Sequence, residues 1–174
     1  MTDAWELLGE RTLHTGWRTV VGRRFRTPDG VEREFEVIVE EDTAVVLALT
    51  DAREVVLVRE YRPGPREALL ELPGGLIDEG ETPVEAAARE LLEETGYAGD
   101  LRPAGSIVDS AYSTRERHTF VATGCRRVQE PEPADGEFPE VVLLALDAFR
   151  EHLRGGRCTD VASGYAGLDA LSLL

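Results

Sequence analysis

The feature that most constrains this chain is an acidic segment bounded by glycines, residues 75–97, which reads GLIDEGETPVEAAARELLEETGY. Within it, Thr82-Pro83-Val84-Glu85 forms a capping box with proline at the first helical position, so a helix is expected to begin at Thr82. Gly96 is a typical helix stop and predicts where the helix ends. The segment therefore specifies one helix together with both of its ends.

Three carboxylates are expected on one edge of this helix. Glu90 and Glu94 are four residues apart and share a face, and Glu93 lies beside them. Like charges at this spacing destabilise a helix, and a hard divalent cation with oxygen ligands is the simplest compensation. Gly74 and Gly75 allow the backbone to approach a ligand closely, and a carbonyl there offers one more metal oxygen. A merely solvated acidic helix is the alternative, against which the bracketing glycines argue.

The remaining positions of the helix divide between packing and support. Arg89 is placed to pair with a carboxylate and hold its rotamer, although an ordinary surface ion pair is the alternative. The face opposite the carboxylates is expected to pack on a sheet, and its residues are Val84, Ala87, Ala88, Leu91 and Leu92.

Composition bounds the class of protein. A chain of 174 residues, 42% of them hydrophobic, can bury a core as one domain spanning residues 1–174. The net charge of −15 argues against nucleic acid as a partner, because that affinity comes mainly from Lys and Arg. No basic leader or long apolar run occurs, so we expect a cytoplasmic protein that does not bind membranes. Cys125 and Cys158 stand far apart and are expected to be reduced packing residues.

Period-two alternation predicts most of the remaining elements. A hairpin is expected over residues 17–40 around the turn at Thr27-Pro28-Asp29-Gly30. Further strands are expected at residues 43–50, 54–59, 69–72, 105–109, 117–123 and 138–146, with helices at 147–154 and 159–173.

The acidic segment resembles a known family signature. Gly75, Glu81, Arg89-Glu90-Leu91, Glu93-Glu94 and Gly96 match the fixed positions of the Nudix box, and Tyr97 stands where an aliphatic residue is usual. Over essentially its whole length the chain is similar to Nudix hydrolases. The resemblance implies an α/β fold, the Nudix α/β/α sandwich with a mixed central sheet, in which residues 1–41 form an N-terminal β-hairpin and residues 42–174 the core.

The same resemblance implies an activity and a metal. Nudix hydrolases cleave the pyrophosphate bond of a nucleoside diphosphate linked to another moiety. Mg²⁺, or Mn²⁺ in its place, would be bound by Glu90 and Glu94, by Glu93 directly or through water, and by the Gly74 carbonyl. A water activated by the metal would attack one phosphorus.

The resemblance also suggests which group accepts the proton of the attacking water. In relatives resembling ADP-ribose pyrophosphatase this base is a glutamate on a loop ahead of a late strand, and Glu137 has the comparable position. Glu140 and Glu116 are alternatives on the loops, and Glu90 or Glu93 are alternatives within the box. Arg89 completes the expected catalytic group.

Two segments ahead of the box point to the ADP-ribose pyrophosphatase subfamily. Residues 58–63, VREYRP, and residues 70–75, LELPGG, resemble its strand and loop signatures. Arg62, and with it Arg59, would then contact a phosphate or the terminal ribose, which suits the forked guanidinium. Balancing nearby acids is the alternative role for both arginines.

The N-terminal hairpin resembles the segment through which these enzymes form homodimers. In such dimers an aromatic side chain of one subunit covers the adenine of the other, and Trp17 or Phe35 are the candidates. Core or interface packing is the alternative for each of them.

One departure widens the choice of substrate. The subfamily usually has a proline about fifteen residues after the box, where this chain reads Asp109-Ser110-Ala111-Tyr112-Ser113-Thr114. Tyr112 resembles a marker of diadenosine polyphosphate hydrolases, and the alternative is that it is the aromatic residue that follows in the loop of the ADP-ribose enzymes. ADP-ribose, cleaved to AMP and ribose 5-phosphate, is the first expectation. Another nucleoside diphosphate sugar, a diadenosine polyphosphate and a catalytically silent nucleotide sensor stay open, and the intact carboxylate set favours an enzyme.

Overall fold

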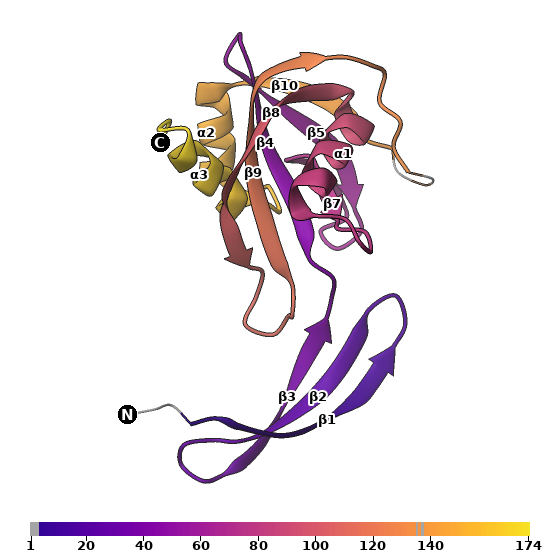
Figure 1. Cartoon of the computed structure of the whole chain (residues 1–174), viewed down its shortest axis with the longest axis vertical. Coiled ribbons are helices and arrows are strands. Elements are labelled where there is room, and N and C mark those ends of the chain that lie inside the picture. The colour runs from indigo at the N-terminus through magenta and orange to yellow at the C-terminus, as the bar shows by residue number, and fades with distance from the viewer. Residues whose placement is uncertain (1–3, 135, 137) are drawn as a thin grey trace. The chain divides into compact units, whose positions relative to one another are not determined.

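The computed structural model describes residues 4–134, 136 and 138–174, and it divides into two compact units (Figure 1). The first unit contains the described residues up to Asp42 together with Val108–Glu116. The second contains Thr43–Ile107 and the described part of Arg117–Leu174.

The first unit is built on a three-stranded antiparallel sheet in the order β1(Glu6–Thr15), β2(Thr19–Arg26), β3(Glu32–Val39). The predicted hairpin is confirmed, since Thr27 donates its backbone N–H to the Val31 carbonyl at 2.9 Å across the turn. β1 is an additional strand, which the sequence reading did not identify.

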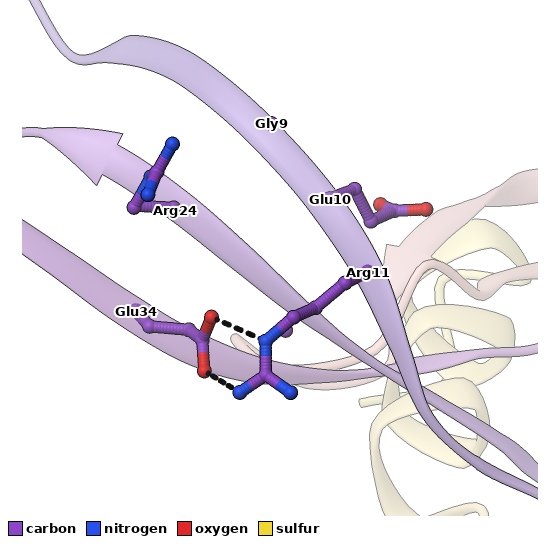
Figure 2. Close-up of a pocket in the computed structure, with 6 residues that line it drawn as sticks. Gly9, Glu10, Arg11, Arg24 and Glu34 are labelled. Atoms are coloured by element: carbon purple, nitrogen blue, oxygen red, sulfur yellow. Dashed lines mark hydrogen bonds and ion pairs between the residues drawn. The ribbon is translucent and has the colours of Figure 1, made fainter.

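The two faces of this sheet differ in chemistry. One face carries an aromatic cluster in which the rings of Trp5, Phe25 and Phe35 have centroids 5.6–6.1 Å apart. Arg11 binds Glu34 through two hydrogen bonds of 3.0 and 2.6 Å beside a shallow notch (Figure 2). That notch is lined by residues whose charges neutralise one another, so it offers no uncompensated charge to a ligand.

The second unit contains a seven-stranded mixed sheet. Its strands are β4(Thr43–Thr50), β5(Glu54–Arg62), β6(Glu67–Glu71), β7(Gly74–Leu76), β8(Tyr97–Val108), β9(Glu116–Arg127) and β10(Glu140–Ala145). The order is β10-β5-β4-β9-β8, with β6 paired to β5 and β7 to β4. β4 runs parallel to β9 and antiparallel to β5, which makes the sheet mixed.

Helices cover both faces of this sheet. α1(Pro83–Thr95) lies on one face, and α2(Leu146–Gly155) and α3(Val161–Ala170) lie on the other (Figure 1). The alternation of β4 explains the arrangement, because Val46 belongs to the core cluster with α1 while Leu47 belongs to the cluster with α2 and α3. The predicted α/β/α sandwich is confirmed.

The box helix has the predicted ends but a different buried face. Thr82 is the N-cap with a complete capping box, and Gly96 is the C-cap with φ of 72°. Val84 is 44% exposed and Ala88 is also exposed, so the expectation that these two pack on the sheet was wrong. The buried residues of the helix are Ala86, Ala87, Leu91, Glu94 and Thr95.

The two cysteines lie in the interior of the protein, as expected for packing residues. Cys125 and Cys158 are free and buried, and burial raises the pKa of each thiol to about 11, as suits packing residues. Within the described residues, no helix has the length and apolar character needed to cross a membrane.

Candidate active site

Two glycines bring the chain close to the box helix where β7 begins. Gly74 donates its backbone N–H to Glu94 Oε2 at 2.9 Å. A Cβ at Gly74 would collide with the Ala44 carbonyl oxygen and the Val45 backbone, and a Cβ at Gly75 would collide with the Glu90 carboxylate. Close approach to backbone atoms of β4 requires glycine at position 74, whereas position 75 approaches only a side chain; the approach to a ligand expected from the sequence stays a prediction.

Arg89 stands at the centre of the acidic edge. Its guanidinium donates to Glu81 at 2.9 Å, to Glu90 at 2.8 Å and to Glu93 at 3.2 Å. It also donates to the Leu76 carbonyl at 3.0 Å, which ties the helix to β7. The hydrogen bond with Glu81 is the main reason why the pKa of Arg89 is raised and that of Glu81 lowered. Arg89 thus holds carboxylates in place, the supporting role expected for it.

The predicted metal ligands differ in exposure. Glu94 is 6% exposed and lies on the buried side of α1, whereas the side chains of Glu90 and Glu93 are increasingly open to solvent. Within the described residues, no three acidic, His or Cys side chains converge on one point as a metal-binding group. Oxygens of Glu90 and Glu93 instead accept hydrogen bonds from Arg89.

The donor chemistry of this edge nevertheless fits a hard divalent cation. The guanidinium of Arg89 pairs with the carboxylates of Glu81, Glu90 and Glu93, and Glu94 follows Glu90 by one helical turn, so acidic side chains outnumber this one basic group along the edge. All of the side-chain donors are oxygens, which Mg²⁺ prefers.

Arg62, at the end of β5, lies close to this acidic set. Its Nε donates to Glu71 Oε2 at 2.5 Å, and its Nη2 lies 2.9 Å from Glu60 Oε2. Burial lowers the pKa of Arg62, but the Glu71 hydrogen bond and the charges of Glu71, Glu60 and Glu94 outweigh it, so the pKa is raised. Arg62 is therefore a fixed cation within electrostatic reach of Glu94.

Arg59 and two of the candidate bases, Glu140 and Glu116, belong to strands of the seven-stranded sheet. Arg59 lies 3.7 Å from Glu140, its register partner at the start of β10, so both belong to an exposed ion pair. Glu116 begins β9, and its backbone N–H donates to Asp42 Oδ1 at 2.7 Å. Glu137, the first choice for the base, lies outside the described residues.

The segment that leads toward residue 137 is attached to the end of the box helix. The Val128 N–H donates to the Gly96 carbonyl at 2.8 Å, and the Glu132 N–H donates to the Glu93 carbonyl at 2.7 Å. These bonds satisfy carbonyls that a helix end otherwise leaves open. Sequence reasoning missed this attachment, because backbone contacts between distant segments leave no residue pattern.

The aromatic candidates belong to the first unit. Trp17 is 98% exposed on the connection between β1 and β2. Phe35 and Tyr112, in contrast, line a cavity of about 410 Å³ together with Trp5, Phe25 and Val37. Trp5 and Phe25 were not among the predicted site residues, although aromatics at alternating strand positions could have suggested a shared face.

Comparisons with known proteins agree with this geometry. The NUDIX domain model matches residues 39–158. ADP-sugar pyrophosphatase of Mus musculus is 40% identical over 97 residues, which are 52% of this chain and only 44% of that protein. ADP-ribose pyrophosphatase of Mycobacterium tuberculosis is 34% identical over 165 residues, covering 91% of this chain and 79% of that protein. A crystal structure described as an ADP compounds hydrolase shares the fold, with a TM-score of 0.80, 23% identity, and coverage of 98% of this chain and 97% of that one.

The two glycines should respond differently to alanine. Gly74→Ala places a Cβ against backbone atoms, so we expect a loss of about 2 to 4 kcal/mol in the free energy of unfolding, measured by urea denaturation. Gly75→Ala meets only the Glu90 carboxylate, so it should shift that side chain and cost less stability. Gly64→Ala, where a Cβ meets open space, is the matched control and should change stability by less than about 1 kcal/mol. Equal stability of the three variants would contradict the close-approach argument.

Proposed function

We propose, because this chain belongs to the NUDIX domain family, that it is a divalent-metal-dependent pyrophosphohydrolase with ADP-ribose as its substrate. The observation that carries the proposal is the acidic edge of α1, where Arg89 holds three box carboxylates and Glu94 accepts a hydrogen bond from Gly74. The products would be AMP and ribose 5-phosphate. The names of the relatives, which refer to ADP-sugars and ADP-ribose, support this choice.

Mg²⁺, with Mn²⁺ as a substitute, is the proposed metal. Glu90 and Glu94 would hold it, Glu93 would bind it directly or through water, and the Gly74 carbonyl would supply a further oxygen. When bound, the ion lowers the pKa of water and neutralises charge on phosphate oxygens. Arg89 would keep the carboxylates at this edge, and so we count it with the catalytic group.

The chain's other residues would bind the diphosphate and move the proton. Arg62 presents a guanidinium held by Glu71, which suits bidentate contact with phosphate oxygens, and Arg59 would assist from the same strand. Water adds to one phosphorus, the bond from that phosphorus to the bridging oxygen breaks, and the leaving phosphate takes up the negative charge. Glu137 is the proposed acceptor of the water proton, with Glu140, Glu116, Glu90 and Glu93 as alternatives.

For the nucleobase we propose the aromatic side chains of the first unit. Phe35 and Tyr112 line the same cavity, whose mostly apolar wall suits a planar ring, and Trp17 is the further candidate. Residues 1–41 would act as a dimerisation hairpin and residues 42–174 as the catalytic core of one domain. The aromatic residues of one subunit would then serve the catalytic core of the other.

Two alternative functions follow from particular observations. The proline-free stretch at residues 109–114 and its Tyr112, 57% exposed, favour another nucleoside diphosphate sugar or a diadenosine polyphosphate as substrate. A silent nucleotide-binding sensor would have the same fold, but the complete set of box carboxylates argues for turnover.

A substrate panel tests the proposed function. ADP-ribose, ADP-glucose, GDP-mannose, NADH, diadenosine polyphosphates and nucleoside triphosphates are each incubated with the protein and Mg²⁺, and the products are separated by chromatography. An Arg-bound diphosphate and an aromatic base cavity match all of the ADP derivatives, and the names of the relatives favour ADP-ribose among them, so ADP-ribose should give the largest kcat/KM. Hydrolysis of no member by a folded protein that binds Mg²⁺ would favour the sensor.

Glu94→Gln tests the metal assignment. The substitution preserves size but removes a ligand charge, so we expect kcat to fall by about a hundredfold or more at saturating Mg²⁺. Glu79→Gln, on the exposed turn before the helix, is the matched control and should retain kcat within about twofold. Turnover of Glu94→Gln near the wild-type rate would refute the assignment.

Glu137→Gln tests the base. Loss of a general base should lower kcat by about a hundredfold while KM changes little, because the base acts only in the chemical step. A change confined to KM would transfer the role to another glutamate, and the same kinetic measurement on Glu140→Gln would serve as the comparison.

The dimer is tested by mass in solution. Sedimentation equilibrium should give twice the monomer mass of 19.1 kDa. If residues 1–41 carry the interface, Phe35→Ser should weaken the dimer, since it removes an aromatic ring from the cluster with Trp5 and Phe25. A monomeric wild type with full activity would overturn the proposed arrangement.

A further inference from the structure

A buried charge network lies beneath Arg62 in the second unit. Glu71, fully buried at the end of β6, accepts a hydrogen bond from Arg62 Nε at 2.5 Å. The other oxygen of the same carboxylate, Oε1, accepts a hydrogen bond from Thr159 Oγ1, also at 2.5 Å. Both oxygens of Glu71 therefore accept hydrogen bonds, one from Arg62, which is proposed to bind phosphate, and one from Thr159, in the segment that precedes α3.

A second ion pair closes the network from the other side. Asp160, 7% exposed, accepts a hydrogen bond from Arg117 Nη1 at 2.6 Å, and the same Nη1 reaches the Thr159 carbonyl at 3.2 Å. Burial raises the pKa of Asp160 to about 6, and the Arg117 guanidinium opposes that rise. Thr159 is therefore held by charged neighbours on two sides, its hydroxyl by Glu71 and its carbonyl by Arg117.

The cost of burying Glu71 calls for an explanation. A fully buried carboxylate is expensive unless it is paired and hydrogen-bonded, and a well-packed apolar side chain would often serve stability equally well. Glu71 stands three residues before Gly74, whose N–H binds Glu94. Its partner Arg62 is half-buried, with Nε on Glu71 and Nη2 on Glu60, and Nη1 takes part in neither contact.

We propose that Glu71 is a positioning residue for substrate binding, which together with Thr159 holds the Arg62 guanidinium so that its remaining edge faces the diphosphate. The inference rests on the proposed function in one respect, the contact between Arg62 and phosphate. A long flexible arginine loses less entropy on binding when its geometry is fixed beforehand, and a charged acceptor fixes it more strongly than a neutral one. Residues 88 positions apart would in this way build one ligand contact.

The test is a double-mutant cycle read by binding. Calorimetry measures the Kd of α,β-methylene ADP-ribose, which is not hydrolysed, in the presence of Mg²⁺. Glu71→Gln keeps the shape of the side chain but removes its charge. Because a neutral amide orients the Arg62 guanidinium less strongly than a carboxylate, the Kd should rise about tenfold. In an Arg62→Ala background the same substitution should change the Kd less than about twofold, because the group that Glu71 positions is gone.

A second variant and a matched control keep the test independent of folding. Thr159→Val replaces the hydroxyl with a methyl group of similar size and should weaken binding about threefold. Thr119→Val replaces another buried hydroxyl, on β9, which donates to Ser163 Oγ of α3 at 3.0 Å, and it should leave the Kd within about twofold. In turnover of ADP-ribose, Glu71→Gln should raise KM and leave kcat within about threefold. This is expected for an interaction that is equally strong in the ground state and the transition state.

The outcomes separate this inference from the proposed function. A folded Glu71→Gln protein with the wild-type Kd overturns the positioning role. The role is also overturned if Glu71→Gln raises the Kd tenfold in the Arg62→Ala background as well. Should Glu71→Gln fail to fold, a wild-type Kd for Thr159→Val overturns it instead. A wild type that binds the analogue but hydrolyses no substrate overturns the proposed function alone, whereas a wild type that fails to bind it overturns the inference.

Discussion

One guanidinium, that of Arg89, makes the acidic edge of the box helix compatible with a folded protein. It contacts Glu81 ahead of the helix, Glu90 and Glu93 on it, and the Leu76 carbonyl of β7. Without this cation, carboxylates three and four residues apart would repel one another along α1. Because Arg89 pairs with three carboxylates and with a strand carbonyl, it joins the helix, the residues ahead of it and β7. The metal proposed for this edge would bind carboxylates that Arg89 already orders.

The sheet determines which groups can meet at this edge. β7 pairs with β4 and brings Gly74 beneath Glu94, while β6 pairs with β5 and brings Glu71 to Arg62. The Pro73 carbonyl accepts the Val46 N–H at 2.9 Å, which fixes the short connection between β6 and β7. The acidic helix and the arginine are therefore positioned by neighbouring strands of one sheet, and neither depends on a free loop.

Local signals made the helix and most strands predictable, whereas contacts between distant residues did not. The capping box at Thr82 and the stop at Gly96 were confirmed because both act within a few residues. A strand was expected to begin at residue 105, but β8 begins at Tyr97, because its exposed and partly buried residues do not alternate regularly. Val84 was assigned to the buried face because it is apolar, but Glu94 occupies the buried side through its bond to Gly74. The Thr159–Glu71 contact was beyond sequence reasoning for the same reason, since only the fold joins these residues.

The two-sided use of β4 has a consequence for how this architecture can change over evolution. Val46 packs toward α1 and Leu47 toward the opposite helices, where Gly167 leaves no room for a Cβ beside Leu47. A single inserted residue would exchange the two rows of side chains, sending each to the wrong layer. β4 can therefore accept substitutions that keep size, but it cannot change length. Insertions and deletions are therefore expected in the connections between elements, with the length of the central strand kept as it is.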